Sequence, residues 1–485
     1  MTQFDNRNIS MMMDFYEMTM ANGYFRDVDA DKKVVFDVFY RANPDEGGFA
    51  IFAGLEQVIE YVENMHFSEE DIAYFREQKL FSEEFLSYLK EFRFQGDIYA
   101  FPEGTIMYPD EPILTVEASL IDAQLVETAI LAQINHQSLI ATKARRIVRA
   151  AGDRAVSDFG ARRAHNMDAA TYGARAAYIG GVVGTATVSA GQMFGIPISG
   201  TMAHSWVMFY GDEFEAFKKY AETYPDATLL LVDTYDVIHS GIPNAIRVSR
   251  EVLEPMGKRL KGIRIDSGDL AYLSKRVRVM LDEAGLSDCK IVVSNSLDEF
   301  TIASLLNQGA CIDSFGVGER LITAKSQPVF GAVYKLSAVG DGKEFTPRLK
   351  VSENVEKITN PGRKDVYRVY DGDGHAVADL LAICGEKVDM SQPCRYVDPQ
   401  KPWKNRYFEG VTAKNLRKLY IKDGKRVEEL PSLDEIRDYV KYQLDHEIWQ
   451  EEQRFENPHR HYLDMTPDYY ELKMSLLHET RKQHG

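Results

Sequence analysis

The feature that most constrains the fold is a regular alternation of short apolar runs with amphipathic helical patterns between residues 154 and 318. Helical patterns such as 212–224 and 270–284 separate the apolar runs. Strands that alternate with helices of this length form βαβ units around a parallel sheet. Each run ends in polar or glycine residues, so the carboxyl ends of the strands are predicted to line one mouth, as in a (β/α) barrel. The predicted strands are 155–159, 229–232, 262–265, 291–294 and 313–316.

A doubly wound open sheet is the alternative to a barrel. Its dinucleotide-binding turn, Gly-x-Gly-x-x-Gly after the first strand, is missing from this chain. The barrel is therefore the favoured α/β fold.

The segments on either side lack this regular alternation. A chain of 485 residues is too long for one ordinary core, so we expect them to form further domains. Residues 1–140 predict an α/β module: a helix at 11–20, strands at 33–40, 96–101 and 113–116, and a long helix over 122–151. The barrel with the active site occupies 141–340. Residues 341–485 predict hairpins over 350–379, with a turn at Asp371-Gly-Asp-Gly374, and a helical tail that packs back on the body and completes the first module.

Composition excludes several classes of protein. The chain is 45% hydrophobic and 27% charged, and its net charge of −17 argues against a nucleic-acid surface. The four cysteines lack metal-binding or C-x-x-C spacing, which indicates a reducing compartment, and we expect a cytoplasmic protein. Charged residues near the start (Asp5, Arg7, Asp14) argue against a signal peptide. The uncharged stretch 176–200 contains six glycines, which favours close packing in an α/β domain over a membrane span.

A candidate site follows the short run 196–200, which is predicted to be a strand that ends at Gly200. Thr201, His204 and Ser205 come directly after it. A histidine among small residues at the carboxyl end of a strand has room for a ligand beside its imidazole. A core histidine satisfied by its neighbours is the alternative.

Three arginines lie near predicted strand ends: Arg162, Arg163 and Arg264. Arginine forks at such positions suit bidentate binding of phosphate or carboxylate. A structural salt bridge to a nearby acid is the ordinary alternative for any one of them.

Backbone amides and carboxylates at the same strand ends predict a phosphate and magnesium site. Gly316-Val-Gly318 could present N–H groups to an anion, although a tight turn is the simpler interpretation. Asp233, Asp236, Asp266 and Asp269 form two D-x-x-D patterns whose oxygens suit Mg²⁺ on a pyrophosphate. For the second acid of each pair, Asp236 and Asp269, capping of a helix is the favoured role.

Some motifs are absent and one is weak. The chain has no Walker loop, G-x-x-x-x-G-K-[ST], and no Gly-x-Ser-x-Gly nucleophile elbow. The tract His459-Arg-His461 could bind a metal weakly, but a solvated tail is favoured there.

Taken together, these motifs and the sequence around them resemble the nicotinate phosphoribosyltransferase family over essentially the whole chain. The matching blocks, in order, are DFYEMTMANGY (14–24), DFGARR (158–163), GTMAHS (200–205), LVDTYD (231–236), RIDSGD (264–269), VSN (293–295), GVG (316–318) and VYKL (333–336).

The resemblance implies a type II phosphoribosyltransferase with an incomplete TIM-like barrel, acting as a homodimer whose active sites take residues from both subunits. The implied reaction of NAD biosynthesis makes nicotinate mononucleotide from nicotinate and 5-phosphoribosyl 1-diphosphate, with Mg²⁺ as cofactor and ATP as co-substrate. Energy from ATP would pass through a phosphohistidine, which the GTMAHS match places at His204.

The resemblance also implies roles for individual residues. Thr201 and Arg264 match positions that bind nicotinate, Phe159 covers one face of the pyridine ring, and Tyr16 of the other subunit covers the opposite face. Residues matching the site of phosphoribosyl pyrophosphate and Mg²⁺ are Arg162, Asp233, Asp266, Ser294, Gly316 and Gly318, and Asp266 and Arg264 join His204 as catalytic residues. Glu319 departs from the pattern, because some relatives have there a threonine that touches this substrate.

Three other functions remain as alternatives. A nicotinamide-selective relative would need an Asp that recognises the carboxamide, but Ala186 occupies that position in our alignment. A quinolinate phosphoribosyltransferase would need a denser basic pocket for its dicarboxylate and no phosphorylated histidine. A catalytically dead, phosphate-binding barrel would not need Tyr16, His204 and Arg264.

Overall fold

The structure, a computed structural model, describes residues 8–27, 32–351, 358–391, 395–399, 401 and 403–484. It divides into two compact units, which we call unit 1 (Met1–Leu139 and Val329–Gly485) and unit 2 (Ile140–Pro328). The long helix α6 (Glu127–Ala151) begins in unit 1 and ends in unit 2. The fold is an incomplete (β/α) barrel with an N-terminal α/β module and a C-terminal extension.

Unit 2 contains the parallel sheet predicted from the alternation. Its strands are β6 (Ala155–Asp158), β7 (Gly184–Thr185), β8 (Leu229–Leu231), β9 (Gly262–Ile265), β10 (Lys290–Val293) and β11 (Ser314–Val317). They lie in the order β7-β6-β11-β10-β9-β8, and every neighbouring pair is parallel. The carboxyl ends of all six strands therefore face one edge, as the sequence predicts.

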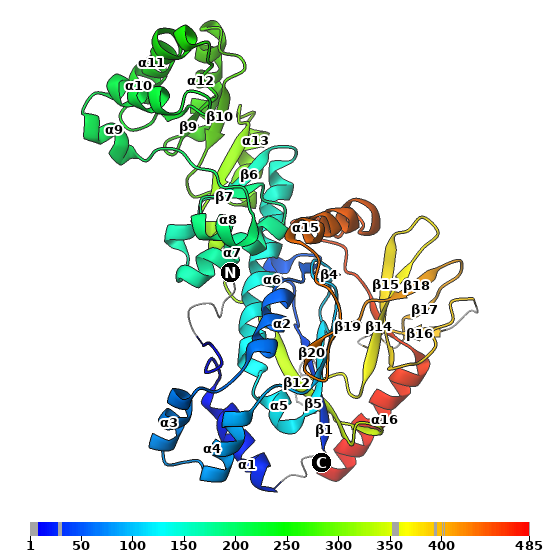
Figure 1. The fold of residues 1–485 in the computed structure, drawn as a ribbon. Coiled ribbons are helices and arrows are strands. Elements are labelled where there is room, and N and C mark those ends of the chain that lie inside the picture. The colour runs from blue at the N-terminus through cyan, green and yellow to red at the C-terminus, as the bar shows by residue number, and fades with distance from the viewer. Residues whose placement is uncertain are drawn as a thin grey trace. The chain divides into compact units, whose positions relative to one another are not determined.

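Helices connect these strands, and one more helix, α14, follows the last of them (Figure 1). They are α7 (Met167–Ile179), α8 (Val188–Phe194), α9 (His204–Tyr210), α10 (Glu213–Thr223), α11 (Ile242–Val248), α12 (Leu270–Glu283), α13 (Glu299–Asn307) and α14 (Glu319–Ile322). Aspartates cap three of the longer ones, because the carboxylates of Asp212, Asp269 and Asp298 each accept a backbone N–H of the first turn. Asp236 caps the π-helix 237–241 in the same way, so the capping roles expected for Asp236 and Asp269 are confirmed.

The predicted strand at 196–200 is wrong. Only one bridge forms there, between Ile198 and Thr185. Pro197 has no N–H to donate, so the segment pairs through its carbonyl and the N–H of Ser199 alone. The uncharged stretch 176–200 instead contains the end of α7, β7 and α8. Within the described ranges no helix combines the length and the apolar character needed to cross a membrane.

Unit 1 is built around two large sheets assembled from distant parts of the chain, beside a small sheet of two short strands, 50–51 and 106–107. Its early elements are α1 (Phe15–Asp27), β1 (Lys33–Phe39), β2 (Ala50–Ile51), α2 (Leu55–Asn64), α3 (Glu69–Glu77), α4 (Glu83–Glu91), β3 (Asp97–Ala100), β4 (Ile106–Met107), β5 (Leu114–Ser119) and α5 (Leu120–Gln124). The predicted helix over 122–151 is two helices, α5 and α6, because Leu125 and Val126 form a turn that buries both side chains.

The later elements of unit 1 complete its sheets. They are β12 (Val333–Gly340), β13 (Phe345–Pro347), β14 (Lys364–Tyr370), β15 (Ala376–Ile383), β16 (Arg395–Val397), β17 (Asn405–Tyr407), β18 (Thr412–Asn415), β19 (Lys418–Lys422), β20 (Lys425–Arg426), α15 (Leu433–Tyr442), β21 (Leu463–Met465) and α16 (Pro467–His484). One sheet has the order β13-β12-β1-β5-β3-β19-β20, and the other β17-β16-β21-β15-β14-β18. The predicted hairpin with its turn at Asp371 is β14 and β15, while residues 352–357 of that prediction lie outside the described residues.

The C-terminal segment packs into unit 1, with α16 beside β15 and β16 (Figure 1). The prediction of a solvated tail at His459-Arg-His461 is wrong for His461, whose side chain is only 1% exposed. Its imidazole stacks on the Tyr108 ring, with centroids 3.7 Å apart, and lies between the carboxylates of Asp379 and Glu452. The polar residues next to His461 in the sequence indicate an exposed segment. The partners that bury His461 come from other elements, so the local sequence does not predict them.

Candidate active site

His204 is the first residue of α9, and its imidazole is held on both sides. Nδ1 lies 3.2 Å from the hydroxyl of Thr234, and Nε2 lies 3.8 Å from Oδ2 of Asp266. The side chain is 40% exposed, so His204 is no buried core histidine and a ligand can reach the ring.

Arg264, on β9, donates to neutral oxygens. Nη1 bonds Oγ1 of Thr201 at 2.5 Å and Nη2 bonds the carbonyl of Met202 at 3.2 Å. It forms no ion pair within the part of the chain that the structure describes, so the salt-bridge interpretation is wrong for this residue. Burial lowers the pKa of Arg264 from its usual value, although nearby Asp266 and Asp233 oppose that change. Nε is buried without a partner, so the guanidinium is suited to an anionic ligand.

Asp233 and Asp266 follow neighbouring strands, β8 and β9, and are fixed by hydrogen bonds. Oδ2 of Asp233 accepts from the backbone N–H of Asp266 at 2.9 Å and from the hydroxyl of Ser267 at 2.7 Å. Oδ1 of Asp266 accepts from Ser294 at 2.5 Å. Oδ1 of Asp233 is buried without a partner, and Oδ2 of Asp266 faces His204.

These two carboxylates can bind a cation together with a substrate. Among the described residues, no three His, Cys, Asp or Glu side chains gather in a way that could hold a metal. Mg²⁺ commonly takes one or two carboxylates and completes its shell with water and substrate phosphates, so the donor set fits that ion.

Phe159 and Gly316 lie against each other at the end of β6 and β11. A Cβ added to Gly316 would lie 2.3 Å from a carbon of the Phe159 ring, so only glycine leaves room for the ring in this position. The N–H of Phe159 donates to the carbonyl of Val317 at 2.7 Å. At Gly318 an added Cβ would lie 3.1 Å from the Phe159 carbonyl. Gly316 and Gly318, which are predicted to present amides to an anion, therefore also leave space for Phe159.

Arg162 and Arg163 lie in a short 3₁₀ turn, 161–163, after Phe159 and Gly160. Both are exposed, and neither forms an ion pair with any described residue. The positive charge of Arg162 lies near enough to contribute to the lowered pKa of Arg264. Glu319 is instead occupied by an exposed ion pair with Lys325 at 2.6 Å.

Tyr16 is on α1 in unit 1, so it is not among the residues that unit 2 brings together. Tyr16 is 43% exposed, and the apolar residues Met12, Phe15 and Met20, which are near it in the sequence, are exposed as well. Partial burial and nearby Glu127 raise the pKa of the Tyr16 phenol above its usual value.

Sequence reasoning missed four side chains that hold the site together: Asp158, Thr185, Thr234 and Ser267. Each bonds a predicted site residue or its neighbour from a different strand or loop. Thr234 and Ser267 directly follow Asp233 and Asp266, which was the available signal.

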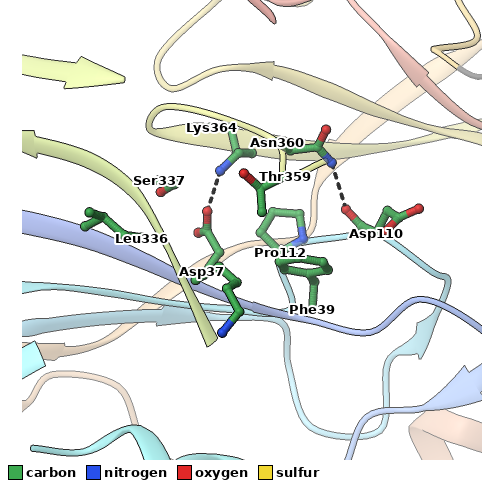
Figure 2. A pocket seen from close by; sticks show the side chains of 10 residues that line it. Asp37, Phe39, Asp110, Pro112, Leu336, Ser337, Thr359, Asn360 and Lys364 are labelled. Atoms are coloured by element: carbon green, nitrogen blue, oxygen red, sulfur yellow. Dashed lines mark hydrogen bonds and ion pairs between the residues drawn. The ribbon is translucent and has the colours of Figure 1, made fainter. Parts of the chain in front are cut away.

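A cavity in unit 1 is too small to bind a substrate, so it is not a second candidate for the active site. It lies between β1, β12 and β14, and the buried ion pair of Lys364 with Asp37 closes one side of it (Figure 2). The amide of Asn360 bonds the carbonyl of Asp110 on the other side at 3.2 Å. The space measures about 10 Å³ for the centre of a water molecule, enough for about one water.

The parallel sheet of unit 2, with an exposed histidine, an arginine and two carboxylates at its carboxyl edge, has the architecture of a barrel enzyme. Sequence profiles of the nicotinate phosphoribosyltransferase (NAPRTase) family match three parts of the chain: the N-terminal domain over residues 11–135, the family's central profile over 154–355 and the C-terminal domain over 363–473.

Individual proteins agree with these profiles. A nicotinate phosphoribosyltransferase of Bacillus subtilis is 45% identical over 483 residues, covering 99% of this chain and 97% of that protein. The crystal structure of human nicotinic acid phosphoribosyltransferase superposes with a TM-score of 0.84 at 28% identity, over 96% of this chain and 100% of the human one. A nicotinate-nucleotide pyrophosphorylase structure from Pyrococcus furiosus has a TM-score of 0.69 at 28% identity, over 92% and 99%. The chain belongs to the nicotinate phosphoribosyltransferase family.

Proposed function

We propose that the site in unit 2 makes nicotinate mononucleotide and pyrophosphate from nicotinate and 5-phosphoribosyl 1-diphosphate, and that ATP hydrolysis through phosphorylated His204 drives this reaction. Family membership supports nicotinate phosphoribosyltransferase activity in NAD biosynthesis. The observation that carries the proposal is the arrangement of Arg264 and Thr201 beside His204 and Asp266 at one edge of the sheet.

Arg264 and Thr201 are proposed to bind the nicotinate carboxylate. Among the described residues the guanidinium donates to a hydroxyl and a carbonyl, and a carboxylate is a stronger acceptor than either. Phe159 would cover one face of the pyridine ring, which leaves the ring nitrogen free to attack. Ala186 adds no negative charge, which supports nicotinate over nicotinamide as substrate.

Asp233, Asp266 and Mg²⁺ are proposed to hold phosphoribosyl pyrophosphate. Departure of pyrophosphate leaves an oxocarbenium-like carbon, and Mg²⁺ bound to the leaving group would neutralise the charge that develops on it. The exposed Arg162 would bind a phosphate of the same substrate, and Ser294 would keep Asp266 oriented. Gly316 and Gly318 permit close approach of the backbone, whereas the ion pair of Glu319 with Lys325 gives Glu319 no evident role in binding.

His204 is proposed to accept the γ-phosphoryl group of ATP on an imidazole nitrogen. Its exposure supports access by ATP, and its contacts with Thr234 and Asp266 would hold the ring in one orientation. We further propose a cytoplasmic homodimer in which Tyr16 of one subunit covers the pyridine ring in the other.

Labelling with ATP tests the phosphohistidine. We expect an acid-labile phosphate on His204, stoichiometric nicotinate mononucleotide formation and ATP hydrolysis, and no label in His204→Ala. His239→Ala is the matched control, because His239 is an exposed histidine of the same unit that pairs with Asp236. Equal labelling of the His204→Ala protein would refute the assignment. Product formation from nicotinate, nicotinamide and quinolinate tests the substrate in the same assay.

A further inference from the structure

Asp158, the last residue of β6, joins two segments through one buried carboxylate. Oδ1 accepts the N–H of Gly160 at 2.8 Å, and Oδ2 accepts the hydroxyl of Thr185 at 2.7 Å. Its backbone carbonyl accepts the N–H of Ala186 at 2.8 Å. The side chain is 1% exposed. Asp158 therefore contacts both the turn that follows β6 and the segment that contains β7.

These segments carry different parts of the pyridine site proposed above. The turn holds Phe159, while the other segment holds Ala186, at the position where a carboxamide-selective relative would have an acid. Thr185 extends the connection, because its N–H donates to the carbonyl of Pro197 at 3.0 Å and its carbonyl accepts from Ser199 at 2.9 Å. Residues 197–199 lead directly to Thr201.

Burying the charged carboxylate of Asp158 costs free energy, which its hydrogen bonds must offset. Burial raises the pKa of Asp158, while the bonds from Thr185 and Gly160 oppose that rise. No cation among the described residues pairs with it, so hydrogen bonds alone compensate its charge. Bonds to an ionised acceptor are shorter and stronger than neutral ones, which suits a residue that fixes a spacing.

We propose that Asp158 is a positioning residue that fixes the distance between the Phe159 ring and Ala186, and thereby determines how well the site discriminates nicotinate from nicotinamide. The inference rests on the proposed function, since it assumes that the pyridine binds beside Phe159. Asp158 itself touches no substrate in this scheme and acts through the Gly160 turn and Thr185.

Two near-isosteric variants weaken the same link from opposite ends. In Asp158→Asn the amide oxygen can still accept from Gly160, and the amide nitrogen that then faces Thr185 can only donate to its hydroxyl. A neutral bond of reversed direction thus replaces the charge-assisted bond. Thr185→Val removes the hydroxyl that bonds Asp158 and also accepts the N–H of Thr187 at 3.0 Å. Ser189→Ala is the control, because it removes an exposed hydrogen bond to Thr171 in the same unit without touching either segment.

We expect each variant to raise the KM for nicotinate about tenfold, the effect of losing one charge-assisted hydrogen bond, with a smaller change in kcat. The ratio of kcat/KM for nicotinate to that for nicotinamide should fall by a similar factor. Because both substitutions act on the same link, the double variant should be no worse than the more affected single variant. Ser189→Ala should match the wild type.

Two outcomes would overturn the inference: fold-changes that multiply in the double variant, or lower melting temperatures with an unchanged KM and selectivity ratio in the folded fraction. If Asp158→Asn fails to fold, Thr185→Val alone decides by the same KM and ratio. A wild type that makes no nucleotide from nicotinate would instead refute the proposed function, so the two failures are distinguishable.

Discussion

At the scale of single residues, Gly316 controls the position of an aromatic ring through the absence of a side chain. The Cβ of alanine there would lie 2.3 and 2.4 Å from two ring carbons of Phe159, so the ring must move. We expect Gly316→Ala to raise the KM for nicotinate at least tenfold, equivalent to about 1.4 kcal/mol of lost binding. Steady-state kinetics would measure it, with Gly372→Ala as control, since an added Cβ meets nothing within 4 Å there. An unchanged KM would show that Phe159 does not contact the pyridine.

Selectivity at Ala186 and Arg264 is a second prediction about residues. Ala186→Asp should add repulsion against the nicotinate carboxylate and offer an acceptor to a carboxamide. The preference for nicotinate should then fall by one to two orders of magnitude, roughly the effect of one charge-assisted hydrogen bond. Arg264→Lys should also impair nicotinate binding, because an ammonium cannot bond Thr201, Met202 and a carboxylate with a planar fork. Comparison of kcat/KM for both pyridines measures these effects, and a preference that does not move in Ala186→Asp would place discrimination elsewhere.

The residues that could be predicted from sequence are those with local signals. Asp236 and Asp269 cap helices that start next to them, and Asp233, Asp266 and Ser294 follow recognisable strands. Asp158 and Thr234 act on partners 27 and 30 residues away. No local pattern shows such pairs, because the sheet order brings them together.

At the scale of elements, a buried charged cluster attaches the C-terminal segment to the sheet of unit 1. Arg368 on β14 donates to both oxygens of Asp379 on β15, at 2.9 and 2.7 Å. His461, just before β21, lies 3.6 Å from Asp379 and 3.2 Å from Glu452. The Tyr108 hydroxyl donates to Glu452 at 2.6 Å, and Glu111 lies beside Asp379. The cluster links strands to a segment about 80 residues later in the chain.

The cluster predicts a stability that falls as pH rises. Burial alone lowers the pKa of His461, but Asp379 and Glu452 outweigh it and the pKa is raised. Burial and Asp379 also raise the pKa of Glu111. For His461 this stabilisation is fully present below about pH 6.5, the unfolded value, and is lost as pH rises through the folded value. Glu111 changes stability in the same direction.

Thermal unfolding from pH 5.5 to 9 would test this prediction. His461→Gln should lower the free energy of unfolding by about 3 kcal/mol at pH 6, the usual cost of removing one partner of a buried ion pair, and by less at pH 9. His459→Gln is the control, because His459 is exposed two residues away. Equal losses at both pH values would mean that the pKa of His461 is not raised in the folded protein.

The two units also differ in how far sequence predicts their elements. Five of the six strands of unit 2 agree with the predicted strands within about two residues, because each has its own apolar run and a following helix. The short strand β7 was not predicted, and the run 196–200 was predicted as a strand but forms only one bridge. In unit 1, β1 pairs with β12 and β5, and β3 pairs with β19, so strands from both ends of the chain share a sheet. Apolar periodicity identifies such strands but carries no information on which of them pair.

At the scale of the whole molecule, exposed apolar residues at the start of α1 are relevant to the number of subunits that form one active site. Phe15, Tyr16 and Met20 on α1, and Met12 shortly before it, are between 37% and 55% exposed. Exposed large apolar residues are common at interfaces. Their presence beside Tyr16 supports the proposed homodimer, in which Tyr16 of one subunit serves the site of the other.

Mixing two inactive variants tests that shared site. Tyr16→Ala would remove the ring supplied to the neighbouring subunit, and Arg264→Ala would remove the carboxylate ligand of the subunit's own site. In a mixed dimer one site would have lost both residues and the other would have lost neither. Equal mixing with free exchange should therefore restore about one quarter of wild-type activity, because half of the dimers are mixed and each has one intact site. Activity and the fraction of mixed dimers, measured with two affinity tags, would be compared over the course of subunit exchange. Activity that stays at the level of the parent variants while mixed dimers accumulate would show that Tyr16 acts within its own subunit or not at all.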